Sequence, residues 1–246
     1  MKKVIGFLML VLFLAACDSL IGSGDSNTGT GSSMSRFACI GTNLYVVDSE
    51  CLQAFDVSDS SKIVRTSRIA AGWNSDIETI FPADTLLFLG SRTGMYIYNL
   101  KTPSAPAFVY RYNHVVSCDP VVVQGKYAYV TMRSDFDSWS CSNGSNQLEV
   151  IDLSDIREPV SKGLYPMTNP RGLAIDGGLL FVCDGLDIAV LDASNPLAIT
   201  EIKRIELDAT PLDVIAKNGN LIVSYAAGLK QYAYANDTIE EISTIY

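Results

Sequence analysis

Hydrophobic residues in this chain occur in short runs separated by polar turns, and the runs repeat along the sequence. One set of five runs occupies residues 43–47, 85–89, 126–130, 178–182 and 220–224. A second set follows after a short polar turn, at residues 52–56, 95–99, 148–152, 188–192 and 229–233. Successive runs of the first set begin 41 or 42 residues apart, with one interval of 52. A constant period with one enlarged loop predicts an internal structural repeat.

Each repeat has two further β-rich segments, so the pattern predicts four strands per repeat. One segment precedes the first run, as at residues 36–40, 120–123 and 171–175, and another ends the repeat, as at 199–207 and 239–245. Units of about 40 to 45 residues with four short strands are typical of propeller blades, which cannot bury both faces alone. We therefore predict an all-β fold: a five-bladed β-propeller of four-stranded antiparallel blades, closed into a ring, over residues 36–246.

Aspartates recur in the turn after the third strand. Asp56, Asp152 and Asp192 each stand two residues before a serine. A carboxylate there can accept a hydrogen bond from the backbone amide two residues on, which favours a structural role over catalysis or metal binding.

Residues 178–196 read Gly-Leu-Leu-Phe-Val-Cys-Asp-Gly-Leu-Asp-Ile-Ala-Val-Leu-Asp-Ala-Ser-Asn-Pro. This segment resembles the LVIVD repeat of bacterial surface and periplasmic propellers. Repeats three and four match best, whereas Asn99 and Ala233 replace the turn aspartate in repeats two and five. The resemblance implies a propeller fold and a secreted location more than an activity.

The N-terminus has the features of an export signal. Lys2 and Lys3 precede an uncharged, apolar run over residues 4–16, which is shorter than the ~20 residues of a spanning helix. Residues 14–17, Leu-Ala-Ala-Cys, resemble the lipobox of bacterial lipoproteins, which implies cleavage before Cys17 and acylation of that cysteine. The alternative is ordinary cleavage after Ala16 with an unmodified thiol.

The predicted organisation is a signal peptide (1–16), a lipidated cysteine with a Gly/Ser-rich tether (17–35) and the propeller (36–246). The tether composition is typical of a flexible linker. Asp18 implies, by resemblance to enteric lipoproteins, retention at the inner membrane, but other phyla differ, so the membrane of the cell envelope stays open.

Charge excludes some partners. After loss of Lys2 and Lys3 the chain carries 16 basic and 27 acidic residues, a formal charge of −11. Such a surface repels nucleic acid and anionic lipid headgroups. We therefore predict contact with the membrane through the lipid anchor alone, and an envelope protein or glycan as partner.

Cysteine spacing gives one candidate crosslink. No CxxC pair occurs among the cysteines, so a structural zinc site has little support. In an oxidising compartment Cys118 and Cys141 are candidates for a disulfide that pins the enlarged loop. The pairing of Cys39, Cys51 and Cys183 stays open.

Candidate chemistry is limited. His114 is the single histidine, which excludes multi-histidine metal sites, and the chain has no G-x-S-x-G, P-loop or G-x-G-x-x-G motif. Loops that enter the innermost strands should meet on one face, and they carry Asp76, Glu78, His114, Asp119, Asn169, Arg171, Thr210 and Asp213. This set could bind Ca²⁺ or a polar ligand, or only cap strands and solvate the channel mouth. No other cofactor is predicted.

Two functions fit these observations. The first is a non-enzymatic binding or scaffold module, with Phe136 and Trp139 of the enlarged loop as an exposed recognition patch. The second is a carbohydrate-active hydrolase or lyase that uses two channel carboxylates. Glycosidases need such carboxyl groups about 5 to 9.5 Å apart across one cleft.

Overall fold

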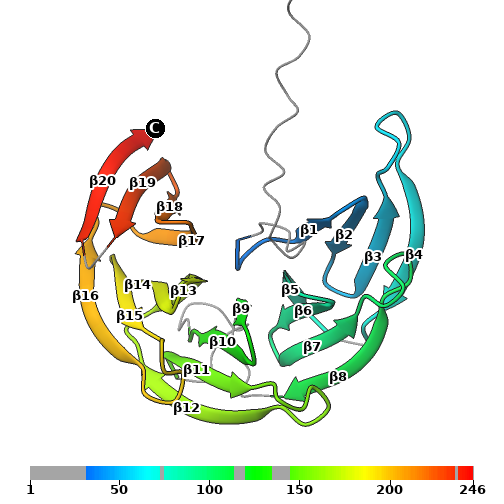
Figure 1. The fold of residues 1–246 in the computed structure, drawn as a ribbon, viewed down its shortest axis with the longest axis horizontal. Helices are drawn as coiled ribbons and strands as arrows, with labels where there is room; N and C mark the ends of the chain where they lie inside the picture. The colour runs from blue at the N-terminus through cyan, green and yellow to red at the C-terminus, as the bar shows by residue number, and fades with distance from the viewer. Residues whose placement is uncertain (1–31, 73–74, 114–119, 135–144, 236–237, 246) are drawn as a thin grey trace, which may run out of the picture.

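The computed structural model describes residues 32–72, 75–113, 120–134, 145–235 and 238–245. These residues form five four-stranded antiparallel sheets and no helix, which confirms the predicted fold class. We call the sheets blades 1 to 5 in chain order (Figure 1). Among the described residues no helix is long and apolar enough to cross a membrane.

The strands have these bounds. Blade 1 holds β1 (Phe37–Ile40), β2 (Asn43–Val47), β3 (Cys51–Asp56) and β4 (Val64–Ala70). Blade 2 holds β5 (Ile77–Ala83), β6 (Leu86–Ser91), β7 (Gly94–Asn99) and β8 (Ala107–Asn113). Blade 3 holds β9 (Val121–Gln124), β10 (Tyr127–Met132), β11 (Gln147–Asp152) and β12 (Val160–Pro166). Blade 4 holds β13 (Pro170–Asp176), β14 (Leu179–Asp184), β15 (Asp187–Asp192) and β16 (Thr200–Glu206). Blade 5 holds β17 (Pro211–Lys217), β18 (Asn220–Tyr225), β19 (Gly228–Ala235) and β20 (Thr238–Ile245).

The register of the second and third strands defines equivalent positions in the five blades. The turn residue of the third strand faces the first residue of the second strand, in the pairs Asp56–Asn43, Asn99–Leu86, Asp152–Tyr127, Asp192–Leu179 and Ala233–Asn220. Compared with this register, the first-set apolar runs read from the sequence begin one residue too early in blades 2, 3 and 4. In a strand, one residue decides which face a side chain occupies.

The turn aspartates have the structural role that was predicted. The amides of Ser58, Ser154 and Ser194 donate to Asp56, Asp152 and Asp192 at 2.8 to 2.9 Å. Hydrogen bonds from these serines hold the pKa of each carboxyl below its ordinary value.

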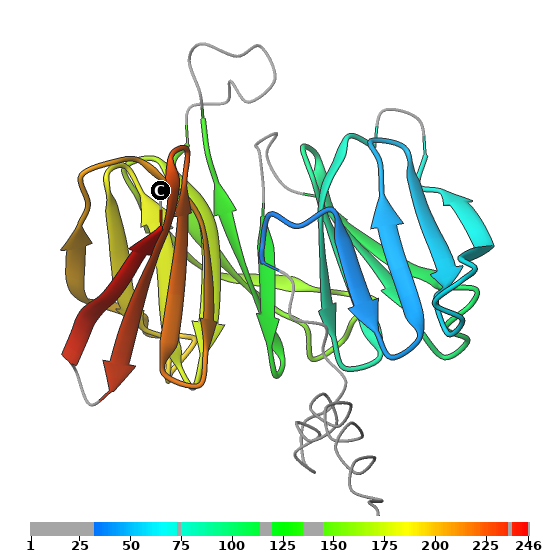
Figure 2. The ribbon, with the colours of Figure 1, turned by 90° about the horizontal axis from the view of Figure 1, so that it is seen from above.

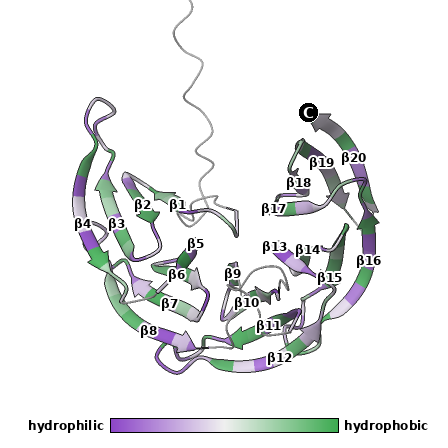
Figure 3. Cartoon of the chain, turned by 180° about the vertical axis from the view of Figure 1, so that it is seen from behind, coloured by the Kyte–Doolittle hydropathy of each residue, from purple (hydrophilic) through white to green (hydrophobic). Residues whose placement is uncertain are grey.

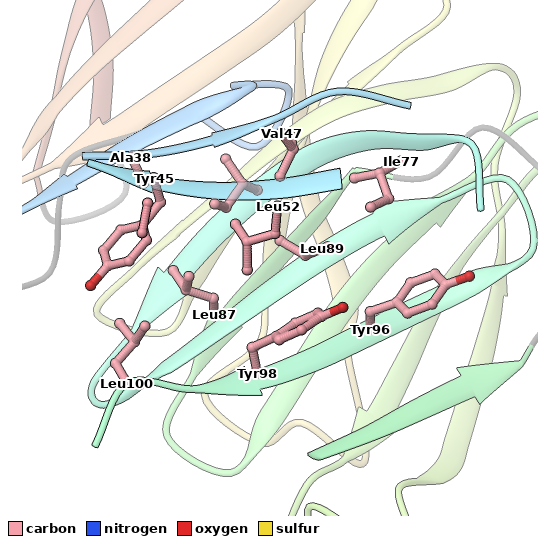
Figure 4. Close-up of a cluster of buried hydrophobic side chains, with 12 residues drawn as sticks. Ala38, Tyr45, Val47, Leu52, Ile77, Leu87, Leu89, Tyr96, Tyr98 and Leu100 are labelled. Carbon is pink, nitrogen blue, oxygen red and sulfur yellow. The ribbon is translucent and has the colours of Figure 1, made fainter. Parts of the chain in front are cut away.

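Neighbouring blades pack face to face through four hydrophobic clusters. The clusters join blades 1 and 2, 2 and 3, 3 and 4, and 4 and 5. Figure 4 shows the first, in which Tyr45 and Leu52 of blade 1 meet Leu87 and Leu89 of blade 2. Two-sided packing explains why the second strands are apolar on both faces.

The prediction of a closed ring is wrong. Figure 1 shows an arc that is open between blade 1 and blade 5, and no cluster of the described residues joins these two blades. Apolar residues occur on strands of both blades that border the opening (Figure 3). Repeats specify how each blade packs on the next, whereas closure depends on the rotation accumulated over all the blades.

A short N-terminal segment, residues 33–35, bridges the centre of this arc. Ser33 is 1% exposed, and its hydroxyl donates to Asp213 of blade 5 at 2.9 Å while accepting from the Leu173 amide of blade 4 at 2.8 Å. The Ile80 amide of blade 2 donates to the Ser35 carbonyl at 2.8 Å. These last residues of the predicted tether therefore pack within the propeller. Figure 2 shows the start of blade 1 reaching the middle of the molecule.

Candidate functional site

A central cavity of about 360 Å³ lies at the inner ends of blades 1 to 4. Its described lining residues are Met34, Arg36, Glu78, Thr79, Pro120, Arg133 and Arg171. Residues 34 and 36 precede β1, residues 78 and 79 belong to β5, residues 120 and 133 flank β9 and β10, and residue 171 lies in β13. Four blades thus contribute side chains to one cavity.

The cavity is electropositive although the chain is acidic. Among the described lining residues, three arginines and one glutamate give a formal charge of +2, against −9 for the whole chain. Charges gathered in a recess with walls of low dielectric constant produce a stronger local potential than the same charges spread over a surface. The cavity therefore favours an anionic ligand.

Backbone contacts fix two of the arginines. The buried hydroxyl of Thr131 in blade 3 donates to the carbonyl of Arg171 in blade 4 at 2.6 Å. The Val47 amide donates to the carbonyl of Arg36 at 2.9 Å. Both backbones are therefore anchored, and the two side chains extend from fixed backbone positions beside the cavity.

Polar atoms at the cavity lack hydrogen-bond partners. Thr79 is 3% exposed, and among the described residues its hydroxyl has no partner, as is also true of the buried Nε of Arg171. Buried polar groups in folded proteins are nearly always paired, and an unpaired one costs about 1 to 3 kcal/mol. Both groups are therefore available to a ligand.

The structure places only some of the predicted residues here. Glu78 and Arg171 line the cavity, whereas Asp76 and Asp213 are absent from its described lining. Asp76 instead pairs with Arg92 of its own blade, at 3.0 Å between Oδ2 and Nη1. Thr210 is exposed beside β17, and Asn169 has a buried, unpartnered Oδ1.

Asp213 fastens the N-terminal segment. Its carboxylate accepts hydrogen bonds from the Ser33 hydroxyl and from the Met34 amide, at 2.9 and 3.2 Å. Burial raises the pKa of Asp213 above its ordinary value, while these donors act in the opposite direction. A β-carbon on Gly172 would lie 2.1 Å from Asp213 Oδ1, so the approach of β17 to β13 requires glycine there.

Several candidates lie outside the described residues, namely Cys17, His114, Cys118, Asp119, Phe136, Trp139 and Cys141. Cys39, Cys51 and Cys183 are free thiols, of which only Cys39 is exposed. Within the described ranges, no group of three or more His, Cys, Asp or Glu side chains could hold a metal ion.

Sequence reasoning missed Arg36 and Arg133. Both flank strands at the predicted ligand face: Arg36 directly precedes the innermost strand of blade 1, and Arg133 directly follows β10. The predicted ligand residues come from the loops that enter the innermost strands of blades 2 to 5, whereas Arg36 falls within a predicted strand. The equivalent position in blade 1, directly before its innermost strand, is occupied by Arg36.

Sequence comparison identifies the repeat family. Residues 117–137 and 169–206 match the LVIVD repeat. None of the curated proteins matches the sequence.

Solved structures with the same fold are distant in sequence. A functionally unknown protein from Desulfotomaculum acetoxidans is 13% identical, with a TM-score of 0.67 over 82% of this chain and 66% of that one. A Lactobacillus plantarum protein is 16% identical, with a TM-score of 0.66 over 88% and 70%. The periplasmic gluconolactonase of Pseudomonas aeruginosa is 12% identical, with a TM-score of 0.61 over 84% and 67%.

This chain thus spans about two thirds of the length of these proteins, and the likeness shows the fold alone. The matched repeats lie in blades 3 and 4, which are built like the other three. The chain is an LVIVD-repeat β-propeller.

Proposed function

We propose that this chain is an exported lipoprotein of the bacterial cell envelope, anchored through Cys17, whose propeller is a non-enzymatic binding or scaffold module for an envelope protein or glycan. The signal-like residues 1–16 and the lipobox-like residues 14–17 support the location. Two or more acyl chains are enough for stable anchoring. The central cavity carries the binding role, because four blades direct side chains into it.

The side chains at the cavity favour binding over hydrolysis. A carboxylate-based glycosidase needs two carboxyl groups across one cleft. Among the described lining residues, Glu78 is the one carboxylate, while Asp76 is bound to Arg92 and Asp213 to the N-terminal segment. Arginines outnumber carboxylates there, and guanidinium groups bind anionic ligands without acting as acid or base at neutral pH.

The anchor is tested by labelling cells with an alkyne analogue of palmitate. The wild-type chain is expected to carry the label in the membrane fraction, and Cys17→Ala is expected to lose it. Cys39→Ala is the matched control, since Cys39 is an exposed thiol of the folded domain, and it should keep the label. An unlabelled wild-type chain would refute the lipoprotein proposal.

The binding role is tested with envelope glycans and proteins captured on the purified chain. The material eluted from the wild-type chain is expected to have the same mass as before binding, because no bond is broken. Trp139→Ala tests whether the enlarged loop contributes, through the amount retained. Shortened glycans in the eluate would support the hydrolase or lyase instead.

A further inference from the structure

The central cavity joins three kinds of chemistry. Guanidinium groups come from Arg36, Arg133 and Arg171, hydrogen-bonding oxygens from Glu78 and Thr79, and apolar surface from residues 34 and 120. A ligand that uses all three must carry an anionic group, hydroxyl groups and a compact apolar face. These features occur together in an acidic sugar.

The anionic group has partners that are not committed elsewhere. The side chains of Arg36 and Arg171 make no ion pair within the described part of the chain, and Arg171 Nε is buried without a hydrogen-bond partner. A guanidinium binds a planar carboxylate through two parallel hydrogen bonds, and a charge-assisted bond is stronger than a neutral one. The arginines therefore match a carboxylate in both charge and geometry.

The remaining lining distinguishes a sugar from a simple anion. The Thr79 hydroxyl is both a donor and an acceptor, and it has no partner in the part of the chain that the structure describes. Glu78 adds acceptor oxygens, which would repel a bare phosphate but can accept hydrogen bonds from sugar hydroxyls. Pro120 is buried and Met34 is 43% exposed, so the cavity wall also has apolar surface.

Size and position agree with a sugar unit. A volume of about 360 Å³ lies in the range of sites for small ligands, roughly 300 to 1,000 Å³. The cavity is bordered by the innermost strands of blades 2 and 4, by residues that precede those of blades 1 and 3, and by Arg133 after β10. It can therefore take one end of a chain-like ligand more readily than a long stretch of peptide.

We propose that the central cavity binds an acidic sugar, either free or at the end of a glycan, with its carboxylate on Arg171 and Arg36 and its hydroxyls on Thr79 and Glu78. This inference rests on the proposed binding function and names its ligand class. The arginines bind and orient the ligand, and no bond is made or broken.

Calorimetric titration of the full mature chain tests the proposal. The probes are glucuronate, a glucuronate-terminated oligosaccharide, glucose and inorganic phosphate. Glucuronate is expected to bind at least tenfold tighter than glucose, which lacks the carboxylate, and tighter than phosphate, which lacks the sugar ring with its hydroxyls and apolar face. Tighter binding of the oligosaccharide than of free glucuronate would identify a glycan end as the source.

Variants test the residues. Arg171→Gln and Arg36→Gln should each weaken glucuronate binding at least tenfold, and Thr79→Val should weaken it less. Arg157→Gln is the matched control, because Arg157 is an exposed arginine outside the cavity. Arg36→Gln also controls for a folding defect, because Arg36 is exposed and its substitution removes no buried group. Thermal unfolding of each variant checks the fold.

Three results would overturn the inference: equal binding of glucose and glucuronate, phosphate binding as tight as glucuronate binding, or unchanged affinity in Arg171→Gln and Arg36→Gln. Retention of envelope material distinguishes failure of the acidic-sugar site from failure of the proposed binding function. If envelope material is still retained by the wild-type chain and by both arginine variants, the binding role stands and the acidic-sugar site does not. If nothing is retained, the binding role fails as well.

Discussion

The packed faces between blades and the end face of blade 5 differ at one equivalent position. Blades 1 to 4 place Tyr45, Phe88, Tyr129 and Phe181 there, each at most 1% exposed and packed against the next blade. Blade 5 has Ile222, which is 37% exposed because no blade follows it. Burial here is decided by the neighbouring sheet, since the strand is paired in the same way in all five blades.

The residue paired with that position shows the same contrast. Blades 1 to 4 have Ala54, Ile97, Val150 and Val190, all buried, whereas blade 5 has Gln231. A polar residue on an outer face is a feature of terminal repeats in solenoid-like arrays. Blade 1 lacks this adaptation, because its outward face includes Phe37, which is 60% exposed, beside Val46. The two ends of the arc are therefore not equivalent.

The largest predicted effect breaks a packed face. Phe181→Ala should lower the free energy of unfolding by about 3 to 5 kcal/mol, because it leaves a cavity between blades 4 and 5. Ile222→Ala, at the equivalent position on the end face, should lower it by less than about 1 kcal/mol. Equilibrium unfolding in urea measures both. Equal losses would mean that the end face is covered in solution.

A smaller effect is expected at the bridge across the arc. Ser33→Ala removes two hydrogen bonds and leaves the Leu173 amide without its side-chain acceptor. The expected loss is about 1 to 3 kcal/mol in the same urea experiment. Ser35→Ala is the control, since the exposed hydroxyl of Ser35 bonds only locally, and it should change stability by less than about 0.5 kcal/mol. If the two variants behave alike, the N-terminal segment does not hold the centre of the arc.

The smallest effect concerns the turn aspartates, which blade 5 lacks. The pKa values of Asp56, Asp152 and Asp192 are lowered in the folded chain, so their contribution to stability is present above the unfolded value of 3.8. This contribution is lost as pH falls through the folded values. A variant with asparagine at all three positions keeps an acceptor oxygen but cannot titrate, and its Tm should fall less than that of the wild type between about pH 5 and pH 2. Parallel Tm curves would contradict this.

The strand count and the blade boundaries could be predicted from the sequence because they are local. The repeat period, the apolar runs and the Asp-x-Ser turns report on the backbone within one blade. The alignment of repeats was less accurate, since apolar runs such as 178–182 and 220–224 leave a one-residue shift undetermined. Only the cross-strand pairs, such as Asp192 with Leu179, fix it.

The candidate site could be predicted only in part. The loops that enter the innermost strands include Glu78 and Arg171, which line the cavity. They also include Asp76 and Asp213, whose carboxylates bind Arg92 and the N-terminal segment instead. Those partners lie 16 and 180 positions away in the sequence. The sequence of a single strand does not show which local or distant donor will bind a carboxylate, so these two contacts could not be predicted.

The repeating unit of this protein follows from its amino-acid sequence: a four-stranded blade, repeated five times, with a turn closed by an aspartate in three of its copies. The tertiary structure decided that the five blades form an open arc, that residues 33–35 bridge its centre, and that three arginines share one cavity. The two kinds of feature differ in how far apart in the sequence the interacting residues are. Strand pairing and turns depend on neighbouring residues, whereas the angle accumulated over five blades and the charges gathered on their axis depend on the packing of all of them.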